Sequence, residues 1–359
     1  MRKSICGLVC AAIAWLAPTS GLAATAQDIV KKLAVLPPAE RKLFLEDGAR
    51  KEGELVFYTS LSLTDYPKIV AAFENRYPFV KTNTYRSTPS GVFTRVDTEA
   101  RAGRYAADVV GSAPVEMWEL KKRGLSTGYL SPELKALPPG SYDPEGNWLA
   151  FEVTPLVLAL NTRSVPAGDR PQTYEELLHP KWKGRMSLGT EEYTWFNILL
   201  EHMGKKKGTE YMQALARQEL HMPGSSSVMR VQLLLAGESA LAIAARGRRV
   251  AEHKAKSAPI DFRLLDPYAA EPNFTALMQR AAHPAAAVLF IDWMLSEEGQ
   301  TRISDDAGRF SIRKGVKHKP WVQELFRKDF VFLSPSSIGP KLGEVTDQYN
   351  QIFGLQRRR

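Results

Sequence analysis

Cysteine is nearly absent from this chain: 359 residues include only two, Cys6 and Cys10, and both lie near the start. They fall in an apolar segment that has the features of a signal peptide, described below. Once this segment is removed, no cysteine remains, and therefore no disulfide, thiolate metal site or cysteine nucleophile. We expect a fold that is held together without covalent cross-links.

Motifs of common enzyme and cofactor sites are also missing. The six histidines include no H-E-x-x-H pair, and neither a P-loop nor a dinucleotide-binding fingerprint is present. One G-x-S-x-G match occurs at Gly124–Gly128, but it follows Lys121–Arg123, whereas a nucleophile elbow needs a buried strand before it. We interpret this match as a helix end and a turn, and expect a non-enzymatic protein with no cofactor and no resident metal.

The N-terminus has the pattern of an export signal. Arg2 and Lys3 precede an apolar run, Ile5–Ala17, which small residues follow up to position 26. The run is too short to span a membrane, and no second run of membrane length follows it. We expect residues 1–26 to be a signal peptide and the protein to be periplasmic, with an N-terminal membrane anchor as the alternative. The candidate cleavage sites follow Ala23, Ala24 and Ala26.

Positive charge is in excess but is not concentrated in one place. The chain has 48 Lys and Arg against 39 Asp and Glu, and loss of residues 1–26 leaves a net charge of +7. Basic runs such as Lys205–Lys207 and Arg357–Arg359 are short and contain no interleaved aromatics, which argues against nucleic-acid binding. The excess charge is compatible with a small anionic ligand.

The body of the chain alternates predicted strands and helices. Strands are expected at 55–60, 79–86 and 108–110, each followed by a polar loop and a helix, which is typical of an α/β lobe with a mostly parallel sheet. The 333 residues after position 26 exceed one ordinary domain, so a second lobe is expected. The mainly apolar segment Trp148–Asn161 can pass into this inserted lobe, and Ile260–Leu265 is the candidate return.

A helix with a defined start and stop is expected at His283–Gln300. Pro284 suits the first helical turn, where its missing N–H group is harmless. Gly299 is expected to end the helix in a left-handed conformation. The apolar residues between them recur at helical spacing and predict one buried face. These are Ala287, Phe290, Ile291, Met294 and Leu295.

Four segments of the sequence also resemble a known protein family. They are G-A-R-K-E-G-E-L-V-F-Y-T-S at Gly48–Ser60, E-A-R-A-G-R-Y-A-A-D-V-V at Glu99–Val110, L-L-H-P-K-W-K-G-R-M at Leu177–Met186, and H-P-A-A-A-V-L-F-I-D-W-M-L-S-E-E-G-Q at His283–Gln300. In this order they resemble family 1 extracellular solute-binding proteins, the periplasmic receptors of ABC importers, and in particular the iron(III)-type branch.

The resemblance implies an α/β periplasmic binding protein fold of type 2, in which two lobes are joined by two crossing strands. Such a protein closes on a small ligand and delivers it to an ABC permease in the inner membrane. We expect a monomer whose first lobe comprises residues 27–153 and 271–359, and whose inserted second lobe comprises residues 154–270.

The family resemblance does not identify the ligand. Iron-binding members typically place two tyrosines after a small-apolar strand of the second lobe, but here Ala240–Ala245 is followed by Arg246-Gly247-Arg248-Arg249. A cation is repelled by these guanidinium groups, whereas a carboxylate, phosphonate or phosphate ester can be bound by Arg246 through two parallel hydrogen bonds. We therefore expect an anionic ligand. A ferric iron receptor using a synergistic anion and an exported hydrolase remain as alternatives.

The candidate ligand-binding residues mostly lie at strand ends and helix starts, where free N–H groups and hydroxyls favour anions. Helix capping is the alternative role of the serines, and a salt bridge that of Arg246. The tyrosines are candidates for an apolar wall, with a core position as the alternative. The set is Thr59, Ser60, Arg86, Ser87, Ser112, Tyr193, Ser225, Ser226, Arg246 and Tyr268.

Overall fold

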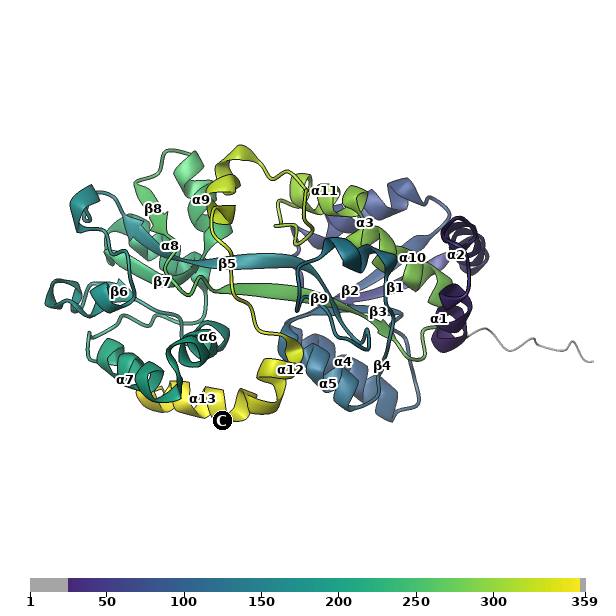
Figure 1. The fold of residues 1–359 in the computed structure, drawn as a ribbon, viewed down its shortest axis with the longest axis horizontal. Coiled ribbons are helices and arrows are strands. Elements are labelled where there is room, and N and C mark those ends of the chain that lie inside the picture. Colours follow the sequence, from purple (N-terminus) through teal and green to yellow (C-terminus); the bar gives the residue numbers. More distant parts are fainter. Residues whose placement is uncertain (1–24, 356–359) are drawn as a thin grey trace, which may run out of the picture.

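Two α/β lobes lie side by side and are connected by two long strands (Figure 1). These strands are β5 (Leu149–Asn161) and β9 (Ala270–Met278), which run antiparallel to each other. The computed structural model describes residues 25–355, so positions 1–24 of the predicted signal peptide and the terminal arginines lie outside the described residues. The two-lobe α/β fold with two crossing strands expected from the sequence is confirmed.

The first lobe is built on a mixed sheet. Its parallel strands are β1 (Glu54–Thr59), β2 (Lys81–Arg86) and β3 (Val109–Ser112), with β1 in the centre. The antiparallel β9 lies beside β3, and the short β4 (Ser126–Thr127) pairs with β9. Helices cover this sheet: α1 (Ala26–Ala34), α2 (Pro38–Glu52), α3 (Tyr66–Arg76), α4 (Pro89–Arg101), α5 (Pro114–Lys122), α10 (Pro284–Leu295) and α11 (Glu297–Asp305).

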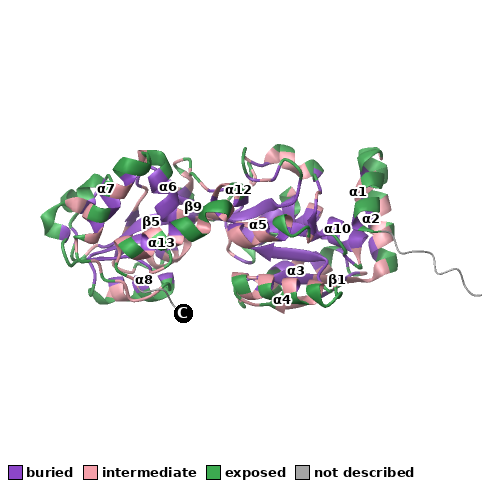
Figure 2. Ribbon diagram, turned by 90° about the horizontal axis from the view of Figure 1, so that it is seen from below, coloured by how far each residue is buried: buried purple, intermediate pink, exposed green. Residues whose placement is uncertain are grey.

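The second lobe uses the other half of β5 as its central strand. The antiparallel strands β7 (Leu241–Arg246) and β8 (Ile260–Arg263) flank it, and β6 (Met186–Ser187) runs parallel to β7. Each lobe buries its own apolar residues around its sheet (Figure 2). The helices of this lobe are α6 (Tyr193–Met203), α7 (Lys205–Ala216), α8 (Ser227–Ala236) and α9 (Gly247–Ala255).

The loops contain short 3-10 helices, and the last part of the chain is helical. These elements are η1 (Pro132–Ala136), η2 (Ala167–Asp169), η3 (Glu175–Leu178), η4 (Pro180–Trp182), η5 (Pro320–Phe326), α12 (Pro335–Ile338), η6 (Gly339–Lys341) and α13 (Leu342–Ile352). Within residues 25–355, no helix has both the length and the apolar character needed to cross a membrane.

The helix expected at 283–300 is in fact two helices. Ser296 adopts an extended backbone conformation, so that it ends α10 and caps α11, where its hydroxyl accepts from the N–H of Gly299 at 3.1 Å. The expected stop at Gly299 is therefore wrong. The expectation of one buried face is wrong too, because every residue of α10 except Asp292 is buried.

The return from the second lobe differs from the expectation. Residues 260–263 form β8, which pairs with β5 inside the second lobe, and the chain returns through β9 instead. The start of β9 contains Glu271, Pro272 and Asn273, residue types that are depleted in strands. For this reason the sequence does not predict a strand at these residues.

The C-terminal part of the chain alternates between the lobes. After α11 of the first lobe, η5 packs on α9 of the second; α12 then packs on α5, and α13 packs on α6 and α7. Leu333, Val345 and Tyr349 are buried in the core of the second lobe. All of residues 271–359 were expected in the first lobe from the sequence. The contacts of η5 and α13 with the second lobe differ from that division.

Candidate functional site

A cavity of about 480 Å³ lies between the lobes, against one face of the crossing strands. Glu152 and Thr154 of β5 and Glu271 and Asn273 of β9 line it. In the sheet register, Glu152 is opposite Asn273 and Thr154 is opposite Glu271. Because successive side chains of a strand point to opposite faces, these four share the face that forms the floor of the cavity.

The first lobe contributes the loops that follow its three parallel strands. Ser60, Ser62 and Asp65 come after β1, Arg86 ends β2, and Ala113 follows β3. The carboxyl ends of parallel strands meet at one edge of a sheet, which is where ligands bind in open α/β sheets. This wall therefore agrees with the placement that the strand–loop–helix rhythm predicts.

The second lobe contributes the starts of two helices. Ser226 and Ser227 lie at the start of α8, and Arg246, Arg248 and Arg249 lie at the end of β7 and the start of α9. Ser226 caps α8, because its hydroxyl accepts from the N–H of Met229 at 3.3 Å. The segment after α11 completes the lining with Arg309 and Phe310.

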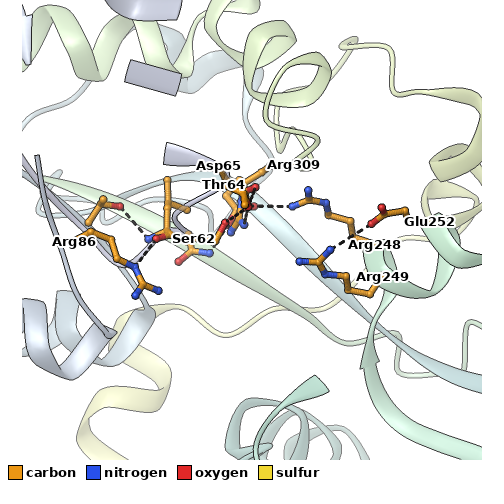
Figure 3. Close-up of polar contacts among 12 residues, drawn as sticks. Ser62, Thr64, Asp65, Arg86, Arg248, Arg249, Glu252 and Arg309 are labelled. Carbon is orange, nitrogen blue, oxygen red and sulfur yellow. Dashed lines mark hydrogen bonds and ion pairs between the residues drawn. The ribbon is translucent and has the colours of Figure 1, made fainter. Parts of the chain in front are cut away.

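Asp65 joins residues of both lobes (Figure 3). Its carboxylate accepts from Arg309 at 2.8 Å and from Arg248, on α9 of the second lobe, at 3.1 Å. Burial opposes ionisation of Asp65, but the two guanidinium groups outweigh burial and lower its pKa. Arg309 also donates from Nε to Glu152 at 2.8 Å, so that it links the crossing strand β5 to the loop after β1.

Arg246 is neutralised by acidic residues of the protein itself. Its guanidinium forms an ion pair with Glu271 on the floor of the cavity and lies 3.8 Å from Glu192. Its backbone N–H donates to the Ser227 hydroxyl at 3.0 Å. Burial disfavours the charged form of Arg246, but Glu271 and Glu192 more than compensate and raise its pKa.

A buried ion pair supports the strand that carries Arg246. Arg230 is completely buried, pairs with Glu192 and donates to the carbonyl of Ile243 at 2.6 Å. This carbonyl precedes Ala244, whose φ of +52° is rare for a residue with a side chain. Gly189 makes room for the pair, since a Cβ there would lie 2.6 Å from the Glu192 carboxylate.

The ten residues selected from the sequence fall into two groups. Four of them line the cavity: Ser60, Arg86, Ser226 and Arg246. The other six lie outside the lining: Thr59, Ser87, Ser112, Tyr193, Ser225 and Tyr268.

The positions of this second group have structural causes. The buried Thr59 accepts from the N–H of Leu61 at 3.1 Å, and the Tyr268 hydroxyl donates to the carbonyl of Leu325 at 3.0 Å inside the core. Tyr193 packs edge-on against Tyr349 of α13. Ser112 is fully buried at the end of β3. Ser87 is half-buried and Ser225 is exposed.

Sequence reasoning left several charged and polar lining residues out of the candidate set, among them Asp65, Glu152, Glu271, Asn273 and Arg309, and it also left out Arg248 and Arg249. Two short patterns carry a signal for three of them. In Glu152-Val153-Thr154 and Glu271-Pro272-Asn273, polar residues alternate with apolar ones, as expected where one face of a strand is in contact with water. Asp65 and Arg309 carry no comparable signal, because their pairing depends on the tertiary fold.

The donor groups of the cavity do not form a ready metal site. Its lining contains no tyrosine, histidine or cysteine, and each of its three carboxylates is paired with arginine. Across residues 25–355, no group of three or more His, Cys, Asp and Glu side chains is arranged to hold a metal ion. The cavity is instead rich in guanidinium groups.

The chain is similar in sequence to known solute-binding proteins. A profile of bacterial extracellular solute-binding proteins matches residues 115–324, more than half of the chain. Iron uptake protein A1 of Synechocystis sp. is 22% identical over 326 residues, covering 86% of this chain and 89% of that protein.

Solved structures share the fold. Iron-bound HitA from Pseudomonas aeruginosa superimposes with a TM-score of 0.72 at 18% identity, covering 83% of this chain and 99% of HitA. AfuA from Actinobacillus pleuropneumoniae, solved with exogenous fructose-6-phosphate bound, gives 0.68 at 22% identity, covering 85% of this chain and all of AfuA. The two-lobe fold and the profile match agree with the resemblance of the four sequence segments, and the chain belongs to the family of bacterial extracellular solute-binding proteins.

Proposed function

We propose that this protein is the periplasmic substrate-binding component of an ABC importer and that it captures a small anionic solute, a carboxylate, phosphonate or phosphate ester. One observation carries the choice of an anion: five arginines line the cavity between the lobes, against three acidic residues. Guanidinium groups bind carboxylate and phosphoryl oxygens through parallel hydrogen bonds. The serine hydroxyls beside them add further donors.

Capture takes place by movement of the lobes about β5 and β9. A ligand that contacts both walls of the cavity stabilises the arrangement in which the lobes are close together, and shifts the population towards it. An inner-membrane permease then recognises this closed form and receives the solute. Walls contributed by both lobes are what this mechanism requires.

Ferric iron held with a synergistic anion is the second candidate function. It is favoured by the names of two similar proteins, Iron uptake protein A1 and iron-bound HitA. The cavity, however, lacks tyrosine and histidine donors, and its carboxylates are engaged by arginine. AfuA, solved with a sugar phosphate, has the same fold, so the fold accommodates anions as well.

A thermal-shift screen of the protein without its signal peptide tests the proposal. A ligand that binds only the folded state raises the melting temperature by mass action, by an amount that grows with its concentration. We expect stabilisation by one or more organic phosphates, phosphonates or carboxylates at millimolar concentration. Stabilisation by ferric iron alone would contradict anion capture, and turnover of a stabilising compound would point to the exported hydrolase.

A further inference from the structure

The charges of the cavity can be assigned pair by pair. Three of its five arginines face a carboxylate in the same cavity: Arg309 faces Glu152, Arg248 faces Asp65, and Arg246 faces Glu271. These pairs use all three acidic residues of the lining. Two cavity arginines, Arg86 and Arg249, remain without an acidic partner in the lining.

Arg86 belongs to the first lobe. Its Nε donates to the backbone carbonyl of Leu61 at 3.0 Å, which fixes the direction of the side chain and leaves the terminal nitrogens available. No ion pair of Arg86 is present among the described residues. Its charge is therefore not compensated by any neighbouring carboxylate.

Arg249 belongs to the second lobe. It lies in the first turn of α9 and forms a long ion pair with Glu252, at 3.4 Å, outside the cavity lining. Glu252 is shared, because Lys256 contacts its other oxygen at 3.0 Å. One carboxylate thus serves two cations, and the charge of Arg249 is at most partly compensated.

The two arginines flank the cavity from opposite lobes. In Figure 3, Arg86 lies on one side of Asp65 and Arg249 on the other, and both are part of the lining. A single negative charge can neutralise only one of them, and the other keeps the uncompensated part of its charge. An anion with two negative charges neutralises both and links the lobes.

We infer that the solute is a dianion bound between Arg86 of the first lobe and Arg249 of the second. This inference rests on the proposed function and narrows its ligand class. Two chemistries provide such a charge: a phosphoryl group with its second proton removed, and a dicarboxylate. The serines at the start of α8 and after β1 are hydroxyl donors for either.

Probes of similar shape and different charge test the inference. Methyl phosphate is compared with dimethyl phosphate, and succinate with monomethyl succinate, by calorimetric titration at pH 8 and low salt, where phosphate monoesters are dianions. We expect the dianion of one pair to bind about 10- to 100-fold more tightly than its monoanion, because it makes an additional charge-assisted contact with an arginine. The pair that shows this difference identifies the phosphoryl or dicarboxylate class.

Substitutions assign the effect to the two residues. R86Q and R249Q should each reduce dianion affinity to the monoanion level, and R86K should retain part of it because the charge remains. R163Q, at an exposed arginine outside the cavity, is the matched control and should bind like the wild type. The melting temperature of each unliganded variant reports on folding.

The outcomes distinguish a failure of the dianion assignment from a failure of anion capture itself. Equal binding of monoanion and dianion, or loss of affinity in only one of the two arginine variants, would overturn the dianion while anion capture stands. Binding of ferric iron with none of the four anions bound at millimolar concentration would overturn both.

Discussion

At the scale of single residues, Arg246 shows which features of a site can be predicted from the sequence and which depend on the fold. The sequence predicts its place after a strand of small apolar residues and its suitability for binding an anion. Its partners Glu192 and Glu271 are distant in the sequence, and only the fold brings them into contact with it. The charge of Arg246 is therefore used to hold the cavity floor, whereas Arg86 and Arg249 have no acidic partner in the lining.

The buried pair of Arg230 and Glu192 should contribute strongly to stability. Substitution R230M removes the cation and leaves Glu192 charged and buried, so we expect the free energy of unfolding to fall by about 3–5 kcal/mol. Urea unfolding followed by circular dichroism measures this change. The double variant R230M/E192M should recover part of the loss; a single variant as stable as the wild type would show that the pair is not needed.

Glu116 should make stability depend on pH. Burial raises its pKa to about 7, whereas the unfolded chain titrates near 4.5. The folded state therefore holds its proton more tightly, and the free energy of unfolding falls as pH rises from 4.5 to 7. E116Q should be more stable than the wild type at pH 8 by about 1–2 kcal/mol, since partial exposure reduces the full penalty, and equally stable at pH 4.

Thermal unfolding at both pH values checks this expectation. E119Q is the matched control on the same helix, and its effect should be small at each pH because its carboxylate is paired at the surface. If E116Q gave the same change in melting temperature at pH 4 and pH 8, the carboxyl of Glu116 would not be the titrating group.

At the scale of helices and strands, the sequence predicted most elements of both lobes but failed where tertiary structure decides. The split between α10 and α11 depends on Ser296, whose capping role competes with a continuous helical pattern. The strand β9 begins with residues that disfavour strands, because its polar face lines a cavity. Both failures arise where function or close packing overrides local preference.

The tight contact between α10 and α11 gives a prediction about Gly299. A Cβ at this position would lie 1.9 Å from the carbonyl oxygen of Trp293, which is backbone and cannot move freely. G299A should therefore lower the free energy of unfolding by at least about 2 kcal/mol. Denaturant unfolding measures the loss.

G343A is the matched control for this substitution, because nothing lies within 4 Å of a Cβ at Gly343 in α13. Alanine suits a helix better than glycine, so this variant should be unchanged or more stable by up to about 1 kcal/mol. Equal effects of the two substitutions would contradict the packing argument.

At the scale of the whole molecule, more than the two strands β5 and β9 connect the lobes. The C-terminal part of the chain passes from α11 to η5, then to α12 and finally to α13, and so contacts the lobes alternately. Tyr349 of α13 also donates to the carbonyl of Gly189, beside the buried pair that supports Arg246. The sequence suggested neither link, because α13 has an ordinary amphipathic pattern that does not specify which lobe it covers.

The ion pair between Asp65 and Arg248 joins the lobes directly beside the cavity, and should influence how far they open. R248Q removes this contact and leaves Asp65 paired with Arg309 inside the first lobe. A partly exposed pair of this kind contributes about 1 kcal/mol, which corresponds to roughly a fivefold change in the ratio of closed to open forms.

Small-angle X-ray scattering of the unliganded R248Q variant should give a larger radius of gyration than that of the wild type, together with weaker binding of any stabilising anion. K256Q, at the residue that follows α9, should leave the radius unchanged, because within residues 25–355 Lys256 forms its ion pair with Glu252 of the same helix and none with the first lobe. An unchanged radius in R248Q as well would mean that the strands and the C-terminal segment set the lobe positions without this ion pair.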